Sequence, residues 1–270
     1  MEKKIKWLIL SIIIAAVGLV PLAISSILTK DLDNDIVIES IKFIARIIPG
    51  LLLFLYMKKV YKIKIGIKRE KLFKGIFWHG LALVLFSTAM LLLNYEEPER
   101  GVVEVLPVLL FYLVTNLGIG LFEEALCRGV LFNSFKVFFG DTKKGVLGAM
   151  FFSSFLFGAL HFGNLNGSNT ISTITQVIYA TFIGMFFSII YYRTGNLLSC
   201  IILHGMVDYF NSFWRLFSND RLAQKMVEDT TDSTIGQAVV TLALTSIFLI
   251  SALVQFKMEF RKRQKAEVKR

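Results

Sequence analysis

The stretch Leu121–Leu131, LFEEALCRGVL, places three ionisable side chains inside an almost unbroken apolar run: Glu123, Glu124 and Arg128. One charge at the centre of a bilayer costs about 2.5 to 3.5 kcal/mol, so such residues face a bundle interior or a wet cavity and indicate function. On a helix, Glu124 and Arg128 are four residues apart, the spacing at which a carboxylate and a guanidinium meet. Glu123 lies about 100° around the helix from Glu124. Because Glu123 has no obvious partner, we interpret it as the reactive group.

The composition around this stretch is that of a membrane protein. The chain has 270 residues, 55% of them hydrophobic, and a mean hydropathy of +0.63, which is too apolar for an ordinary soluble domain. A transmembrane helix needs about 20 mostly apolar residues. We therefore predict an all-α, polytopic transmembrane helical bundle of about eight spans. The spans are residues 5–28, 36–57, 72–94, 104–133, 145–162, 170–192, 197–217 and 235–256.

The basic residues predict the orientation of this bundle, because cytoplasmic loops are enriched in Lys and Arg. If the N-terminus is cytoplasmic, the inner segments hold 21 of the 30 Lys and Arg residues and the outer segments hold five. We predict an integral protein of the cell membrane with both termini cytoplasmic. The net charge of +10 follows from this topology and favours anionic lipid, not nucleic acid, as the neighbour.

Two features bear on processing and redox state. Residues 1–28 combine a basic start with an apolar run longer than the usual 7 to 15 residues of a signal peptide, so we predict an uncleaved first helix. Cys127 and Cys200 lie within spans and share no short metal-type spacing. Neither is predicted to form half of a disulfide.

The fourth span allows two arrangements. From Glu104 to Gly140 a helical pattern continues without a clear stop, over about 54 Å at 1.5 Å per residue. Either the helix is steeply tilted and extends into the cytoplasm, or it breaks near Gly129 and its second piece lies in the interface. Glu123 sits near mid-depth in the first arrangement and nearer the cytoplasm in the second.

Polar side chains on two other spans complete a constellation with Glu123. His161 ends the fifth span, and His204 and Asp208 lie at i and i+4 on one face of the seventh. A carboxylate and an imidazole can hold and deprotonate a water, and His204 could donate a hydrogen bond to an oxyanion. Small residues on the fifth and sixth spans predict close helix packing. The spacing therefore predicts one shared site on three helices.

Three motifs in this order resemble those of the CAAX-protease and bacteriocin-processing (CPBP, or Abi) intramembrane peptidases. They are EExxxR at Glu123, Glu124 and Arg128, FxxxH at Phe157 and His161, and HxxxN/D at His204 and Asp208. The resemblance covers residues 104–217 and implies a peptidase core of four transmembrane helices there. Residues 1–103 would supply three N-terminal transmembrane helices. Residues 218–270 would supply an outer loop, the last transmembrane helix and a basic cytoplasmic tail.

The resemblance implies an intramembrane endopeptidase that hydrolyses a peptide bond of a membrane-associated peptide or protein. Glu123 would be the general base on water, and His161 would help to position that water. His204 and Asp208 would form the oxyanion side. The pair of Glu124 and Arg128 would be structural.

Asp208 leaves the question of a metal open. The prenyl-protein branch of the family usually has asparagine at this position, and an ionised aspartate cannot donate a hydrogen bond. Asp208 therefore stays protonated, orients His204 or binds metal. Glu123, His161 and His204 are of the residue types of a catalytic zinc set, but the chain has no local chelate such as HExxH. We favour water activated by glutamate with no certain cofactor, and zinc assistance is the alternative.

Two other classes of function compete with the peptidase. A non-catalytic immunity or scaffold protein of the same fold would bind a peptide without cutting it, and a transporter would also need intramembrane polar groups. A cysteine nucleophile at Cys127 is disfavoured because no histidine lies nearby in the sequence. The topology places His161 toward the outer side, so it reaches Glu123 only if the fourth helix is tilted or broken, or the fifth ends as a shallow re-entrant segment.

Overall fold

A computed structural model describes residues 2–60, 69–166, 170–218 and 234–268, and in these residues every regular element is helical. The elements are α1 (Glu2–Leu28), α2 (Asp35–Val60), α3 (Arg69–Phe73), η1 (Lys74–His79), α4 (Leu81–Leu93), α5 (Val102–Glu124), η2 (Ala125–Phe132), α6 (Asn133–Phe139), α7 (Lys143–Ala159), η3 (Leu160–Asn166), α8 (Thr170–Thr194), α9 (Leu197–Ser212), η4 (Trp214–Phe217) and α11 (Ile235–Val268). The predicted all-α class is confirmed.

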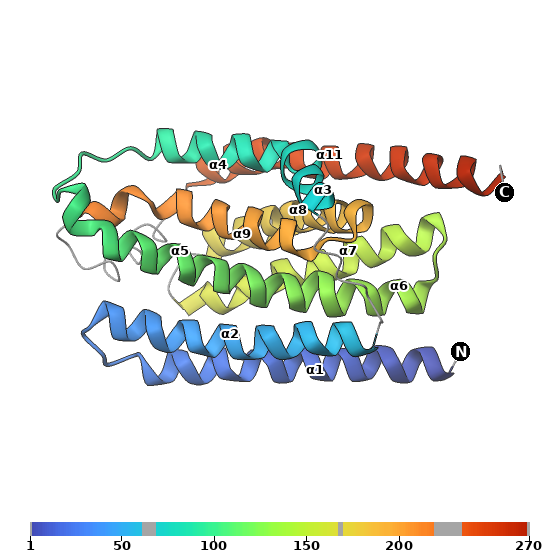
Figure 1. Cartoon of the computed structure of the whole chain (residues 1–270), viewed down its shortest axis with the longest axis horizontal. Helices are drawn as coiled ribbons and strands as arrows, with labels where there is room; N and C mark the ends of the chain where they lie inside the picture. The colour runs from blue at the N-terminus through green and yellow to red at the C-terminus, as the bar shows by residue number, and fades with distance from the viewer. Residues whose placement is uncertain (1, 61–68, 167–169, 219–233, 269–270) are drawn as a thin grey trace.

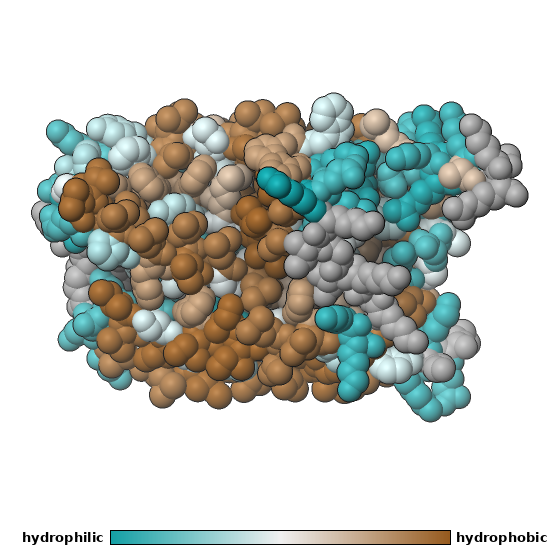
Figure 2. All heavy atoms as spheres, viewed as in Figure 1, coloured by the Kyte–Doolittle hydropathy of each residue, from teal (hydrophilic) through white to brown (hydrophobic). Residues whose placement is uncertain are grey.

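The long helices lie side by side along one axis, as a membrane bundle requires. In Figure 1, α1 and α2 form an antiparallel hairpin on one side, α4 and α11 lie on the other, and both termini lie at the same end. Figure 2 shows a brown apolar band around the middle of this face with hydrophilic residues at both ends. Large apolar side chains are exposed along α1 and α11, such as Ile13 at 52% and Leu244 at 59%. Because water would penalise such exposure, lipid is the expected surrounding.

Five helices in the described residues are long and apolar enough to cross a membrane: Lys4–Leu28, Val102–Phe139, Lys143–Leu165, Thr170–Thr194 and Ile235–Ala266. A sixth is counted if Arg69–His79 and Leu81–Leu93, bent by 63° at Gly80, form one span. The predicted count of eight is therefore not confirmed. Of the two remaining predicted spans, α9 has only 16 residues and α2 has Pro49 in its interior.

The predicted fourth span is one continuous helical stretch from Val102 to Phe139, so it does not break near Gly129. Instead, residues 125–132 form the π-helical segment η2, a conformation that often marks functional sites. The Asn133 side-chain amide donates hydrogen bonds to the carbonyl oxygens of Arg128 and Gly129, at 2.9 and 2.7 Å. The stretch ends at Gly140, whose φ of 86° favours glycine. Glu123 lies at the α-to-π junction.

Small residues allow the backbones around the site to touch. A Cβ atom on Gly120 would lie 2.7 Å from the carbonyl oxygen of Ile201, so α5 and α9 meet without intervening side chains. A Cβ atom on Gly184 would lie 2.9 Å from the Ser154 side chain, and the Ser154 and Ser188 hydroxyls are 3.3 Å apart. The predicted close packing of the fifth and sixth spans, α7 and α8, is thus confirmed. These contacts fix the register of the helices that carry the polar groups.

Candidate active site

Glu124 and Arg128 form an ion pair at the centre of the bundle. Both side chains are 0% exposed, and the Arg128 Nη1 lies 2.9 Å from the Glu124 Oε1. The Arg128 Nη2 donates to the carbonyl oxygen of Gly184 at 2.9 Å. The guanidinium also lies over the rings of Phe157 and Phe187, at 4.8 and 5.1 Å from their centroids. A buried charge is stable only when it is paired and hydrogen-bonded, as Arg128 is here. Through these contacts the pair connects η2 to α7 and α8.

Glu124 also fixes His204, a contact that the sequence spacing does not reveal. The Nδ1 atom of His204 lies 2.8 Å from the same Oε1 of Glu124 that accepts from Arg128. The imidazole stacks on Phe187 at 5.4 Å and meets the edge of Phe157 at 5.8 Å. Since 80 residues separate His204 from Glu124, no local pattern could have signalled the bond. The ring is held from three sides, and its Nε2 atom is left for contacts with other groups.

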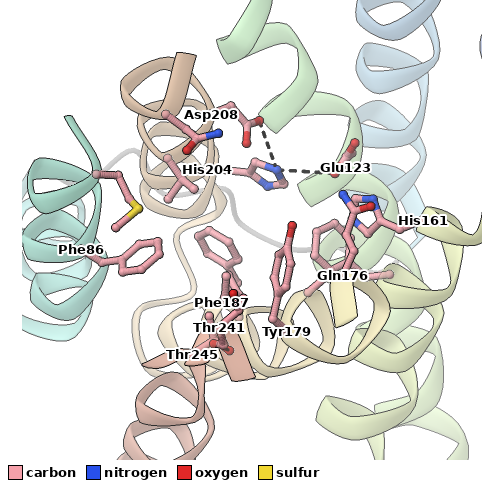
Figure 3. A pocket seen from close by; sticks show the side chains of 16 residues that line it. Phe86, Glu123, His161, Gln176, Tyr179, Phe187, His204, Asp208, Thr241 and Thr245 are labelled. Carbon is pink, nitrogen blue, oxygen red and sulfur yellow. Dashed lines mark hydrogen bonds and ion pairs between the residues drawn. The ribbon is translucent and has the colours of Figure 1, made fainter. Parts of the chain in front are cut away.

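The Nε2 atom of His204 faces two carboxylates (Figure 3). Glu123 Oε2 lies 3.5 Å away and Asp208 Oδ2 lies 3.6 Å away. Because Nδ1 donates its proton to Glu124, a neutral ring would point a bare lone pair at two further acceptors. The arrangement therefore calls for a proton on Nε2 or on one of the two carboxyl groups. Such a shared proton is what an acid–base site holds.

Glu123 and Asp208 are accessible, whereas Glu124 is not. The side chain of Glu123 is 20% exposed and that of Asp208 is 34% exposed, against 0% for Glu124. All four residues predicted as catalytic line one cavity of about 450 Å³: Glu123, His161, His204 and Asp208. Of the two neighbouring glutamates, only Glu123 faces space in which a water and a substrate fit.

His161 reaches this cavity from the 3-10 segment that ends the fifth span. α7 ends at Ala159, and the 3-10 segment η3 that follows carries His161, whose ring meets the edge of Phe157 at 5.6 Å. Figure 3 shows His161 beside Glu123 on the rim of the pocket. The difference in depth that the topology suggested therefore does not keep the two side chains apart. They share one cavity although they belong to different helices.

The rest of the cavity is largely apolar, with a few polar side chains that the sequence analysis did not single out. The apolar lining comprises Phe86, Met90, Phe157, Ala180, Ile183, Phe187 and Val207, and the added polar lining comprises Gln176, Tyr179, Thr241 and Thr245. Asn211 also lines the cavity, and its spacing places it on the same helical face as His204 and Asp208. Single polar residues within spans, such as Gln176 and Tyr179, have no motif spacing. No signal in one sequence distinguishes them from ordinary core or interfacial residues.

Zinc ligation by Glu123, His161 and His204 stays a prediction. Within residues 2–60, 69–166, 170–218 and 234–268, no group of three or more His, Cys, Asp or Glu side chains could hold a metal ion. The Nδ1 atom of His204 is committed to Glu124, and its Nε2 atom is directed at carboxylates. Cys127 and Cys200 are buried free thiols outside the cavity lining.

Residues 105–210 match the model of a protein family described as type II CAAX prenyl endopeptidase Rce1-like. The matched segment runs from α5 to α9 and contains all three motifs. The match confirms the resemblance to the CPBP peptidases and suggests intramembrane peptidase activity. No curated protein and no solved structure significantly matches the chain.

Proposed function

Because residues 105–210 match the Rce1-like family model, we propose that this protein is an intramembrane endopeptidase that cleaves a membrane-presented peptide or protein with a water activated by Glu123. One observation carries the proposal. Glu123, His161, His204 and Asp208, from three separate segments of the chain, line a single cavity inside an apolar bundle. A site that excludes bulk water strengthens each electrostatic interaction within it.

The reaction uses groups that the chain itself supplies. The Glu123 carboxylate accepts a proton from a water held with His161, and the water oxygen attacks the scissile carbonyl carbon. The π electrons of the carbonyl move onto its oxygen, which becomes an oxyanion facing the Nε2–H of His204. When the oxyanion collapses, the C–N bond breaks and the leaving amine takes the proton from Glu123. The products are a carboxylic acid and an amine, so water is the only co-reactant.

The roles of Glu124 and Asp208 follow from their contacts with His204. Glu124 holds Nδ1 at 2.8 Å, and Asp208 lies 3.6 Å from Nε2. Two carboxylates favour the protonated imidazole, which can then donate to an oxyanion. Because an ionised aspartate has no proton to donate, Asp208 acts through His204.

We further propose that α2 and α9 cross the membrane with the six candidate spans, giving eight, and that both termini are cytoplasmic in the cell membrane. Both termini lie at one end of the bundle (Figure 1), as an even number of spans requires. The N-terminal segment and the C-terminal tail are rich in Lys and Arg, as cytoplasmic segments are. Residues 104–217 are the proposed peptidase core, between three N-terminal spans (1–103) and the last span with its flanking loop and tail (218–270).

The proposal is tested by comparing new peptide termini, by mass spectrometry of membrane and secreted peptides, in cells with the wild type, Glu123→Gln or no protein. Products should vanish equally in the last two while the variant inserts at the normal level. Glu39→Gln, a membrane-helix glutamate paired with Lys42 at 3.0 Å and absent from the cavity lining, is the matched control. If Glu123→Gln behaves as wild type while the deletion retains a phenotype, the non-catalytic immunity or scaffold function replaces the peptidase.

A further inference from the structure

Tyr179 on α8 contributes a hydroxyl to the cavity opposite the motif residues. It lines the cavity together with Gln176, one helical turn earlier. Figure 3 shows the phenol oxygen directed into the space bounded by Glu123, His161 and His204. A hydroxyl at this place faces the atoms that would react.

The proposed reaction needs a hydrogen-bond donor that the motif residues do not supply. An oxyanion is best stabilised by more than one preorganised donor. The Nε2 atom of His204 can supply one such bond, but Asp208 is a pure acceptor when ionised. A tetrahedral oxyanion next to Asp208 therefore lacks the second donor that an asparagine amide would provide. Any second donor has to come from elsewhere in the cavity lining.

Position in the cavity selects among the remaining donors. Thr241 and Thr245 lie on α11 at the far side of the pocket in Figure 3, beyond Phe187. The Gln176 amide oxygen accepts from the Asn164 Nδ2 at 2.9 Å, and the same side chain hydrogen-bonds Tyr179, so its amide is already engaged. Of the donors labelled in Figure 3 outside the three motifs, Tyr179 is the one whose hydroxyl points at the reacting groups.

The helix that carries Tyr179 is anchored to its neighbours next to the site. Five residues further along α8, the carbonyl oxygen of Gly184 accepts from Arg128 at 2.9 Å. Ser188 on the next turn lies 3.3 Å from Ser154 of α7. α8 is thereby locked to the same Glu124–Arg128 pair that orients His204. Donors held in this way need little reorganisation when the oxyanion forms.

We propose that Tyr179 is a catalytic residue, whose phenol O–H donates the second hydrogen bond to the oxyanion and replaces the donor that an ionised Asp208 cannot provide. The inference rests on the proposed peptidase function. When the water attacks the carbonyl carbon, the negative charge on the carbonyl oxygen is shared between His204 Nε2–H and Tyr179 O–H. The tyrosine keeps its proton throughout, and Glu123 carries the proton taken from water.

The test measures kcat and KM of the full-length protein in proteoliposomes, with a substrate identified by the peptide comparison. Tyr179→Phe removes the hydroxyl and keeps the ring. It should lower kcat by about 10²- to 10³-fold, the usual loss for one oxyanion donor, with KM unchanged. Tyr112→Phe is the matched control because Tyr112 is 8% exposed and lies outside the cavity lining, and it should retain the wild-type kcat.

A rescue variant separates a donor from a structural tyrosine. Adding Asp208→Asn to Tyr179→Phe introduces an amide donor beside the oxyanion, so kcat should rise above that of Tyr179→Phe alone. A wild-type kcat in Tyr179→Phe, an equal loss in Tyr112→Phe or no gain from Asp208→Asn would overturn the role of Tyr179. Each of these outcomes is compatible with the proposed peptidase function. That function is contradicted by a different result, in which the wild-type protein shows no cleavage that Glu123→Gln abolishes.

Discussion

A single buried arginine organises the centre of this molecule. The planar guanidinium of Arg128 uses Nη1 for Glu124 and Nη2 for the Gly184 carbonyl oxygen, and its faces rest on Phe157 and Phe187. A lysine has one point charge and no planar fork, so it could not make these contacts together. The same Glu124 oxygen then orients His204. The packing of three helices and the geometry of the site thus depend on one side-chain pair.

The pair of Glu124 and Arg128 yields a prediction about stability. Arg128→Leu leaves the buried Glu124 carboxylate without its cation, and we expect the free energy of unfolding to fall by about 3 to 5 kcal/mol. The double variant Glu124→Leu/Arg128→Leu should lose less, because no charge remains uncompensated. Reversible unfolding in detergent micelles measures both, with the exposed Lys143→Leu as control. An equal or larger loss in the double variant would contradict this account of the pair.

The contacts of the two His204 ring nitrogens also predict how the cleavage rate responds to metal chelators. Since His204 has both ring nitrogens directed at carboxylates, we expect 1,10-phenanthroline to leave the cleavage rate unchanged. The measurement is kcat in proteoliposomes before and after chelation, with a zinc protease treated in parallel to show that the chelator works. Inactivation that added Zn²⁺ reverses would restore the set of Glu123, His161 and His204 as metal ligands.

At the scale of single residues, the sequence predicted which side chains share one site but not all of the contacts between them. Charged and imidazole groups stand out in apolar spans because burying them is costly, and so Glu123, His161 and His204 could be picked out. Tyr179 could not, because tyrosine is common in membrane helices and interfaces. The bond between Glu124 and His204 depends on tertiary packing. Spacing along one helix carries no information about it.

At the scale of elements, the site depends on backbone contact between α5 and α9. Gly120→Ala would place a Cβ atom 2.7 Å from the Ile201 carbonyl oxygen and 3.4 Å from the His204 Cβ. Backbone cannot give way as a side-chain end can, so α9 must shift. Overpacking of this kind costs about 1 to 3 kcal/mol, and displacement of His204 should lower kcat.

Parallel kcat and unfolding measurements on Gly120→Ala and Gly148→Ala test this expectation. Gly148 lies on α7, and its added Cβ atom would meet only the Phe139 ring at an ordinary 3.4 Å. We expect Gly148→Ala to keep both the wild-type kcat and the wild-type stability. If Gly120→Ala matches Gly148→Ala in both measurements, the close contact does not position the site.

Two elements show where periodicity stops being informative. The continuous apolar pattern left both a long tilted fourth helix and a break near Gly129 open. A π-helical segment leaves the apolar run unchanged and so cannot be recognised from it. The third predicted span, residues 72–94, bends by 63° at Gly80. A Cβ atom there would lie 2.7 Å from the Gly75 carbonyl oxygen. Glycine permits this bend, but its presence in an apolar run does not require one.

For the whole molecule, composition was sufficient to predict the class and insufficient to count the spans. Eight apolar stretches of about 20 residues are visible in the sequence, but the helix that forms from 197–212 is only 16 residues long and a 3-10 turn follows it. Length alone cannot say whether such a helix crosses the bilayer. The three loops that the predicted spans leave at 58–71, 163–169 and 218–234 lie partly outside the described residues.

Labelling of single cysteines decides the proposed topology. Cys127 and Cys200 are both 0% exposed, so the native background should be low. Asp31 and Glu97 are exposed in the α1–α2 and α4–α5 connections, at the end of the bundle opposite both termini. Asp31→Cys and Glu97→Cys should therefore react with a membrane-impermeant maleimide in intact cells.

The complementary sites are Lys143 at the start of α7 and Lys265 near the end of α11, both exposed at the end of the bundle where the termini lie. Lys143→Cys and Lys265→Cys should react only after the cells are permeabilised. The reverse pattern at all four sites would support the same number of spans but would place both termini outside the cell. Mixed labelling within either pair would show that one of the helices between the sites does not cross, with α2 and α9 as the first candidates.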